Sequence, residues 1–348
     1  MARISDKDVE FLIEYFDVET GLTELIAEDE GTRLFKVNWP SKMANVFILD
    51  SPEARALACL PHIVSASFYT LNLRLALKVV DIIAVFLKES SLTPLYLHVL
   101  RAAPGYMLHE ALRWMGLCMP EVFVRPKYVS CMERDHREKR VVIKAKNFAS
   151  MPSDSSIILV KPDTEATGRT SIESLREAFK EARARDSEIV EIILYGFISI
   201  KALKNIFEFA GRHGVKRVTV VALLDLAALA SNDYDMVLYG PDEQLVSRGI
   251  DARLGAIIDE STFTECLPLY MPGMDQPGDW SARQDILFDG EKFVREDVYI
   301  HLSESLEKAY KLQKISSRSS WFRSIHAEAF KLNIKALTTA INRLGRNY

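Results

Sequence analysis

The chain has 348 residues, of which 48% are apolar and 26% are charged, and its formal net charge is −4. This composition supplies enough apolar side chains for a large core and excludes wholesale disorder. The polar N-terminal sequence MARISDKDVE lacks the apolar region of a signal peptide, and no apolar run is long enough to span a membrane. We therefore expect a cytoplasmic protein without a membrane partner.

Residues 1–44 are expected to form a small N-terminal segment, the lead-in, which precedes the regular part of the fold. Apolar spacing predicts a helix over 6–16, and alternation predicts a strand over 31–39. The apolar run 45–50 then predicts a buried strand, and helical spacing of apolar residues predicts a long helix over 68–87.

A regular alternation of strands and helices follows. It predicts an α/β fold with a mostly parallel sheet flanked by helices on both faces. The predicted strands are 95–100, 122–130, 141–147, 155–160, 190–197 and 215–224, and the predicted helices are 106–116, 172–185 and 200–214.

Residues 226–265 interrupt this rhythm and are expected to form an insert with one short strand. The extension 285–348 is expected to be helical, with two helices separated by the sequence SSRSS at 316–320. The apolar side of this helix pair can contact a second copy of the chain or pack on its own domain. Both possibilities are open from the sequence.

The charge is unevenly distributed along the chain. Residues 301–348 contain nine Lys or Arg against three Glu, a charge of +6, so the preceding 300 residues carry −10. A basic tail can bind an anionic partner, or it can be a solvated helix face. Nucleic acid is not expected as the partner, because the tail has no recognised binding motif and the body is acidic.

The four cysteines are widely separated and show neither metal-ligand spacing nor a disulfide framework. We expect reduced and mostly buried thiols. They are Cys59, Cys118, Cys131 and Cys266.

The segment ILVKPDTEATGRTSIESL, 158–175, is the most informative part of the sequence. An apolar strand runs into a turn with Asp163, Thr167, Gly168 and Thr170, and a helix follows. Free backbone N–H groups at such a helix N-terminus bind phosphate, and glycine lets the backbone approach closely. A plain helix cap after a glycine turn is the alternative, and the segment is not a Walker A motif.

The sequence PDTEATGRT within this turn resembles the phosphoribosyl-pyrophosphate loop of the phosphoribosyltransferases. The uracil-specific branch reads Asp-Pro-x-x-Ala-Thr-Gly-Gly-Ser, so here the Asp-Pro order is inverted and Arg169 replaces the second glycine. The resemblance implies that Asp163 holds the ribose and that Thr167 to Thr170 hold the 5-phosphate. The implied phosphoribosyl-pyrophosphate contacts are Arg101, Asp163, Thr164, Ala166, Thr167, Gly168, Arg169 and Thr170.

Two segments upstream resemble further parts of this family. LHVLRAAPGYM at 97–107 is similar to the strand and turn that contact pyrophosphate, which implies that Arg101 binds it; an Arg fork suits phosphate oxygens. CMERDHREKRVVIKAK at 131–146 is similar to the flexible arm, which implies a pyrophosphate contact for Arg134. A solvated hairpin is the alternative for this charged segment.

Downstream, LYMPGMDQPGDWSARQ at 269–284 resembles the uracil-binding segment of the family. Trp280 replaces its terminal arginine, and Arg283 follows three residues later. Trp280 can stack on a base or pack in the core. The implied base contacts are Met271, Pro272, Gly273, Gly278 and Asp279.

VFILDSPEARALACL at 46–60 is similar to the opening strand and helix of the family, with Asp50 and Pro52 in place. The resemblance thus covers 45–284. It implies a phosphoribosyltransferase-like domain there, containing the insert 226–265, between the lead-in and the helical extension 285–348.

The resemblance implies an enzyme that transfers ribose 5-phosphate from phosphoribosyl pyrophosphate to uracil or a related small base and releases pyrophosphate. Arg101, Arg134 and Asp163 are the implied catalytic residues, with Mg²⁺ bound mainly through phosphoribosyl pyrophosphate and a homodimer as the assembly. Because Arg169, the Lys161-Pro162 pair and the base segment depart from the family pattern, a catalytically inactive nucleotide-binding or regulatory protein is the alternative.

Overall fold

A computed structural model describes residues 4–89, 91–129 and 140–344 of the chain. At its centre these residues form a ten-stranded sheet in the order β1-β2-β3-β9-β8-β7-β4-β5-β6, with β12 paired to β9. The strands are β1 Thr23–Asp29, β2 Thr32–Val37, β3 Ala44–Asp50, β4 Thr93–Val99, β5 Glu121–Tyr128, β6 Val141–Asn147, β7 Ser156–Pro162, β8 Glu188–Ser199, β9 Arg217–Ala227 and β12 Ala256–Ile257.

The central strands from β3 to β5 run parallel to one another. The two edges are antiparallel, since β1 and β2 extend β3 on one side and β6 extends β5 on the other. The predicted α/β fold with a mostly parallel sheet is therefore confirmed.

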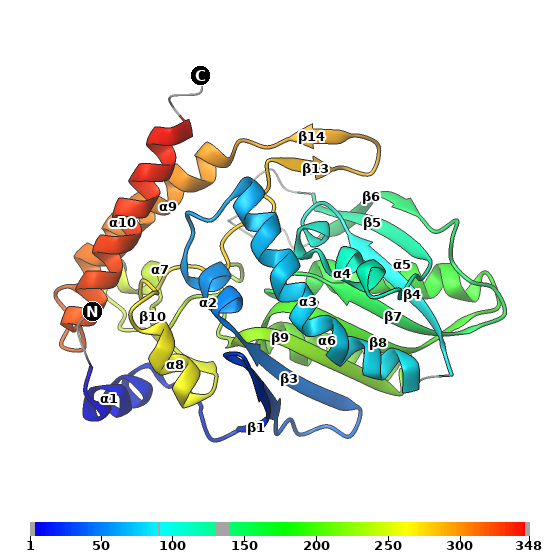
Figure 1. Ribbon diagram of the computed structural model, residues 1–348, viewed down its shortest axis with the longest axis horizontal. Helices are drawn as coiled ribbons and strands as arrows, with labels where there is room; N and C mark the ends of the chain where they lie inside the picture. The colour runs from blue at the N-terminus through cyan, green and yellow to red at the C-terminus, as the bar shows by residue number, and fades with distance from the viewer. Residues whose placement is uncertain (1–3, 90, 130–139, 345–348) are drawn as a thin grey trace.

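Helices cover both faces of this sheet (Figure 1). Successive side chains of a strand point to opposite faces, so Ile193 and Tyr195 of β8 join one apolar core, while Ile192 and Leu194 join the other. The first core lies under α2 Pro52–Cys59, α3 Ser65–Glu89 and α4 Leu108–Trp114, and the second under α5 Arg169–Arg183 and α6 Ile200–Arg212.

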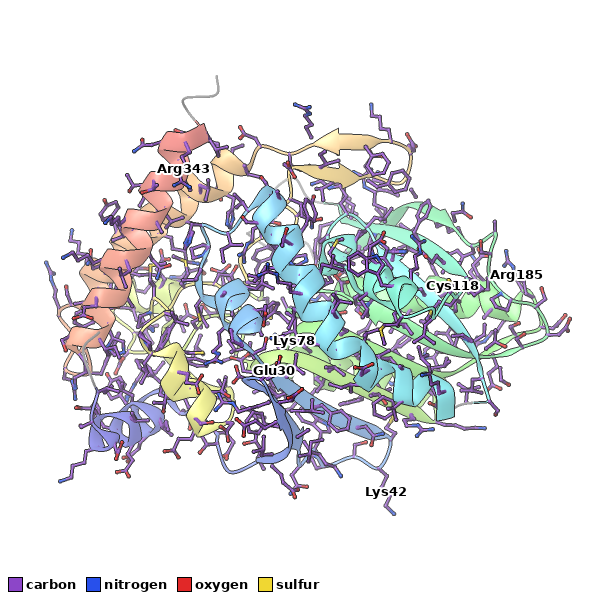
Figure 2. All side chains as sticks on the ribbon, viewed as in Figure 1. Glu30, Lys42, Lys78, Cys118, Arg185 and Arg343 are labelled. Atoms are coloured by element: carbon purple, nitrogen blue, oxygen red, sulfur yellow. The ribbon has the colours of Figure 1, made fainter. Side chains whose placement is uncertain are left out.

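Side chains fill the space between these helices and the sheet, whereas charged residues such as Lys42 extend into solvent (Figure 2). None of the helices in the described part of the chain is long and apolar enough to cross a membrane.

The predicted helix over 6–16 is α1 Asp6–Phe16. The insert contains more structure than the one short strand expected: after β9 come β10 Gly240–Pro241, α7 Glu243–Val246, β11 Arg253–Leu254 and α8 Glu260–Cys266, besides β12. Two-residue strands carry no alternation that a sequence pattern can reveal. Strand β1 was not predicted either, because its residues are almost all exposed and show no apolar face.

The extension begins with a hairpin, β13 Ile286–Phe288 and β14 Phe293–Arg295, which was not predicted. Helices α9 Val298–Ser316 and α10 Ser324–Leu344 follow and pack against each other (Figure 1). Their apolar side packs on the chain's own body: the Trp321 ring lies 4.9 Å from the Phe16 ring, and Phe330 is fully buried.

Three cysteines lie in the described residues, where they are free thiols: Cys59 and Cys266 are buried and Cys118 is exposed. Burial raises the pKa of Cys266, with the neighbouring Cys59 as a further cause, so that thiol stays protonated at neutral pH. Cys131 lies outside the described residues.

Candidate functional site

A cavity of about 340 Å³ lies beyond the carboxyl ends of β4 and β7, where open parallel sheets commonly bind ligands. Three segments that are far apart in the sequence line it. Arg101 follows β4, Asp163 lies in the turn between β7 and α5, Thr170 lies in the first turn of α5, and Asp279 belongs to the loop before β13. Residues of β5 complete the wall, including Arg125, Lys127 and Tyr128.

The turn between β7 and α5 is held in a left-handed conformation at Gly168, the N-cap of α5, whose φ is +74°. A Cβ at this position would lie 3.2 Å from the carbonyl oxygen of Ala202. Asn205 fixes the same turn by donating to the carbonyl of Thr167 at 2.9 Å. The glycine thus allows α5 to begin close to α6, with its N-terminus at the cavity beside Thr170.

Other residues of this turn contact protein groups. The Thr164 hydroxyl is 2.6 Å from the Tyr106 hydroxyl, and Arg169 lies 3.5 Å from Asp233. Thr167 accepts a hydrogen bond from the Arg169 backbone N–H at 3.4 Å. Ala166 is partly buried, and its carbonyl accepts from the Ser199 hydroxyl. Of the turn and the start of α5, Asp163 and Thr170 reach the cavity wall.

Asp163 is part of a buried charged cluster. The Lys161 ammonium group, which is fully buried, lies 3.3 Å from Asp163 Oδ2 and also pairs with Glu165. Asp163 Oδ1 accepts the Thr164 N–H at 2.9 Å. Burial raises the pKa of Asp163 to about 7, with Lys161 lowering it and Glu165 raising it. The Asp163 carboxyl can therefore change its charge near neutral pH.

Arg101 lines the cavity with about a third of its side chain exposed, and its guanidinium group forms an ion pair with Glu296, just after β14. The peptide bond before it, Leu100–Arg101, is cis. Arg134, the second predicted pyrophosphate contact, lies outside the described residues.

The predicted base-binding segment is divided between the core and a second cavity. Met271 is fully buried in the core and Pro272 is buried, whereas Gly273, Gly278 and Asp279 line a cavity of about 350 Å³. The Asp279 carboxylate accepts the N–H groups of Ser281 and Ala282 at 3.0 and 3.2 Å. Asp279 lines both cavities, which are therefore adjacent.

Trp280 and Arg283 are structural residues of this segment. The Trp280 ring is buried and stacks on Tyr106 with centroids 4.4 Å apart, so core packing, the alternative to base stacking, is observed. The fully buried Arg283 guanidinium donates to the carbonyls of Leu57 and Pro277, each at 2.6 Å. Burial lowers the pKa of Arg283 to about 9, and the group anchors the loop to α2.

The second cavity has an acidic lining that the sequence did not reveal. Its walls come from the insert, the base segment and α9, and two of its lysines are paired: Lys308 lies 2.6 Å from Asp235, and Lys311 pairs with Glu243. The charged lining residues are Asp235, Asp242, Glu243, Asp275, Asp279, Glu304 and Glu307, against Lys308 and Lys311. An anionic ligand is disfavoured there.

A buried network supports the floor of this cavity. Asp225 of β9 accepts the Tyr239 hydroxyl at 2.7 Å and the Gln276 side-chain amide at 2.9 Å. Burial raises the pKa of Asp225 to about 6. Gln276 belongs to the segment that resembles the uracil-binding segment, and the structure uses its amide as a donor to Asp225. A second buried carboxylate here would have no such donor.

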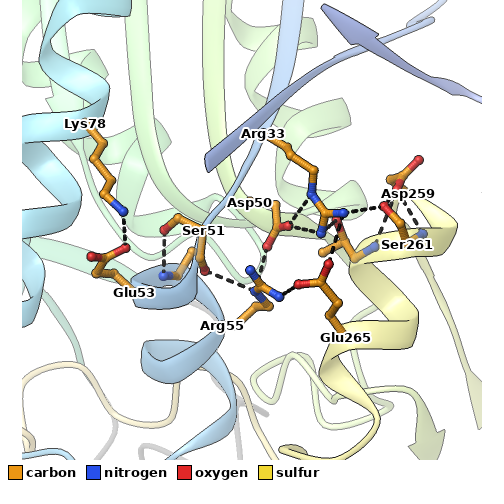
Figure 3. A network of polar contacts seen from close by, with 11 residues as sticks. Arg33, Asp50, Ser51, Glu53, Arg55, Lys78, Asp259, Ser261 and Glu265 are labelled. Carbon is orange, nitrogen blue, oxygen red and sulfur yellow. Dashed lines mark hydrogen bonds and ion pairs between the residues drawn. The ribbon is translucent and has the colours of Figure 1, made fainter. Parts of the chain in front are cut away.

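Asp50, at the start of the resemblance, belongs to a separate ion cluster (Figure 3). Its carboxylate is fully buried and pairs with Arg33, whose Nε donates at 2.9 Å, and with Arg55 at 3.1 Å. Both arginines also pair with Glu265 of α8. The cluster therefore joins β2, β3 and α2 to the insert, away from both cavities.

The described residues contain no group of three or more His, Cys, Asp or Glu that could hold a metal ion. Two carboxylates line the first cavity: Asp163 pairs with Lys161, and Asp279 accepts the N–H groups of Ser281 and Ala282. This donor set does not fit a Mg²⁺ ion held by protein ligands alone.

The sequence matches no protein-family model and no curated protein. Among solved structures, the fold resembles adenine phosphoribosyltransferase from Trypanosoma brucei, at 17% identity over 51% of this chain and 83% of that chain, with a TM-score of 0.33. It also resembles a hypoxanthine phosphoribosyltransferase from Staphylococcus aureus, at 13% identity over 42% of this chain and 73% of that chain, with a TM-score of 0.28. At these TM-scores the likeness assigns neither an activity nor a substrate.

Proposed function

We propose that the chain binds phosphoribosyl pyrophosphate and transfers its ribose 5-phosphate to uracil or a related small heterocyclic base, releasing pyrophosphate. The observation that carries the proposal is the lining of the first cavity. Three segments that the sequence predicts to bind phosphoribosyl pyrophosphate or the base meet at this cavity. They contribute Arg101, Asp163, Thr170 and Asp279, and all four residues line it.

In this proposal, different walls of the first cavity bind different parts of phosphoribosyl pyrophosphate. The N-terminus of α5, with Thr170 on the cavity wall, holds the 5-phosphate. Asp163 accepts hydrogen bonds from the ribose hydroxyls. Arg101, joined by Arg125 and Lys127 of β5, holds the pyrophosphate, with Arg134 as a further contact.

The acceptor base occupies the second cavity, where Gly273, Gly278 and Asp279 present backbone groups and one carboxylate. Because carboxylates dominate its charged lining, a neutral base such as uracil is favoured over an anionic one. The adjacency at Asp279 brings the base close to the ribose.

The transfer breaks the bond between C1 and a pyrophosphate oxygen and forms a bond from C1 to a base nitrogen. The pyrophosphate leaves with the bonding electron pair, and the base nitrogen releases its proton to solvent. The protein's contribution is to position both substrates and to stabilise the charge on the leaving group. Mg²⁺ carried by phosphoribosyl pyrophosphate neutralises part of that charge.

A nucleotide-binding or regulatory protein without turnover is the second candidate. Three ion pairs favour it: Glu296 engages Arg101, Lys161 engages Asp163, and Asp233 engages Arg169. Each occupies a charge that the transfer reaction would use.

Calorimetric titration with phosphoribosyl pyrophosphate and Mg²⁺, followed by pyrophosphate release with neutral and carboxylated bases, separates the candidates. Binding with release that depends on a neutral base supports the transferase. Binding without release supports the regulatory protein. Equal binding by wild type, Arg101→Gln and Asp163→Asn contradicts both. Arg212→Gln, which removes an exposed arginine at the end of α6, is the matched control.

A homodimer is part of the same proposal, and analytical ultracentrifugation tests it. A monomer at micromolar concentration would contradict it.

A further inference from the structure

The hairpin β13–β14 directly precedes the N-terminus of α9 and lies beside β5 and β6 (Figure 1). Its Phe288 ring meets the Phe123 ring of β5 with centroids 5.7 Å apart. A Cβ on Gly290 would lie 2.8 Å from Ala145 of β6. The same Cβ would lie 3.7 Å from Leu100, which lines the first cavity, so the hairpin lies at the rim of that cavity.

Two residues of this segment engage arginines that line the cavity. Glu296, directly after β14, forms an ion pair with Arg101. At the turn of the hairpin, Asp289 accepts from Arg125 Nη1 through its carbonyl oxygen at 2.8 Å, with its carboxylate 3.6 Å from the same nitrogen. Asp289 directly follows β13 and Glu296 directly follows β14, so the hairpin engages both arginines at the same time.

We propose that the segment 285–297 is a strap in which Glu296 acts as an internal competitor for anions at the candidate site. The inference rests on the proposed function, because it assumes that Arg101 binds the pyrophosphate group. A guanidinium fork that faces a carboxylate offers the same N–H groups that a phosphate needs. An entering pyrophosphate must therefore displace Glu296 from Arg101.

The structure of the strap allows it to move. Its strands are three residues each, and its Phe293 side chain is 75% exposed. Its two ends are anchored nearby: Gln284 donates to the carbonyl of Ala102 at 3.0 Å, and Asp297 caps α9 by accepting the Tyr299 N–H at 3.0 Å. Short hairpins with few buried contacts open at low free-energy cost while their anchors remain in place.

The test is calorimetric titration of the full chain with inorganic pyrophosphate and Mg²⁺. We expect Glu296→Gln to bind about three- to fivefold more tightly than wild type, the upper part of the range for a partly exposed ion pair. Glu291→Gln, which removes the same charge from the exposed tip of the same hairpin, should stay within about twofold of wild type.

The double variant Arg101→Gln/Glu296→Gln separates direct competition from a general loss of negative charge. If the strap acts through Arg101, Glu296→Gln gives no gain when Arg101 is already replaced. A gain that persists in that background overturns the proposal, as does equal binding by Glu296→Gln and wild type. Hydrogen exchange gives a second measurement: pyrophosphate should accelerate exchange in 286–295, and unchanged exchange there also counts against the strap.

These outcomes are distinct from failure of the proposed function. If Arg101→Gln weakens pyrophosphate binding while Glu296→Gln leaves it unchanged, the site is supported and the strap is wrong. If Arg101→Gln binds as wild type does, or no variant binds pyrophosphate, both proposals fail together.

Discussion

Lys161 places a buried positive charge between two buried carboxylates. A fully buried ammonium group is tolerated when it is paired, and here Asp163 and Glu165 both pair with it. The pair also makes Asp163 responsive to pH, because burial raises its pKa to about 7 while Lys161 opposes that rise. The side chain proposed to hold the ribose thus changes charge in the physiological range.

We expect the pH dependence of pyrophosphate binding to report this titration. Above the raised pKa of about 7 the Asp163 carboxylate is ionised and repels the anion, and below it the protonated group does not. Wild type should therefore lose affinity relative to Asp163→Asn as pH rises from about 6 to about 8. Titration of pyrophosphate itself affects both proteins equally. Parallel calorimetric profiles for the two proteins would contradict the prediction.

At the scale of elements, the start of α5 depends on Gly168. An alanine there would have to adopt a φ of +74° and place its Cβ 3.2 Å from the carbonyl oxygen of Ala202. We expect Gly168→Ala to lower the free energy of unfolding by about 2–3 kcal/mol, measured by urea denaturation.

Gly214→Ala is the matched control for this change. Its φ is +78°, but a Cβ there would have no heavy atom within 4 Å. Gly214→Ala should lower the free energy of unfolding by about 1 kcal/mol, because only the unfavourable backbone conformation contributes there. Equal losses in the two variants would mean that the approach of α5 to α6 contributes nothing.

The Asp50 cluster connects four elements through one buried carboxylate (Figure 3). Asp50→Asn leaves Arg33 and Arg55 without their buried counter-charge, so we expect a loss of about 3–5 kcal/mol in the free energy of unfolding. Glu265→Gln removes a partner whose side chain is 45% exposed and should cost less than about 1 kcal/mol. Similar urea midpoints for the two variants would contradict this ranking.

At the scale of the whole molecule, the C-terminal helices are part of the body. The Asn333 side-chain amide of α10 donates to the carbonyl of Leu269 at 2.8 Å, and α9 forms a wall of the second cavity. A truncation at residue 301 should therefore open the proposed acceptor site.

A single substitution tests the docking of these helices. Phe330 is fully buried, so Phe330→Ala should lower the free energy of unfolding by about 3–5 kcal/mol, measured by urea denaturation. Leu332, two residues along the same helix, is 54% exposed, and Leu332→Ala should change it by less than about 1 kcal/mol. If Phe330→Ala costs as little as the control, α10 is not docked as described.

The sequence by itself determined the helices and strands of the sheet core and the three segments whose ends meet at the first cavity. Their apolar periodicity is a local property, and parallel strands bring their carboxyl ends to one edge. The hairpin β13–β14 had a usable local signal that was missed, since the short apolar runs 286–288 and 293–294 flank a turn with the pair Asp289-Gly290.

The tertiary structure decided which side chains of those segments are free to act. Trp280 and Arg283 lie in the segment predicted to bind the base, yet both are buried by partners more than 100 residues away in the chain. Trp280 stacks on Tyr106, and Arg283 donates to the carbonyl of Leu57. Likewise, only the packing of the hairpin shows that Glu296 engages Arg101. Periodicity places a residue on its own element, whereas contacts between elements depend on strand order and on where loops close, which no local pattern records.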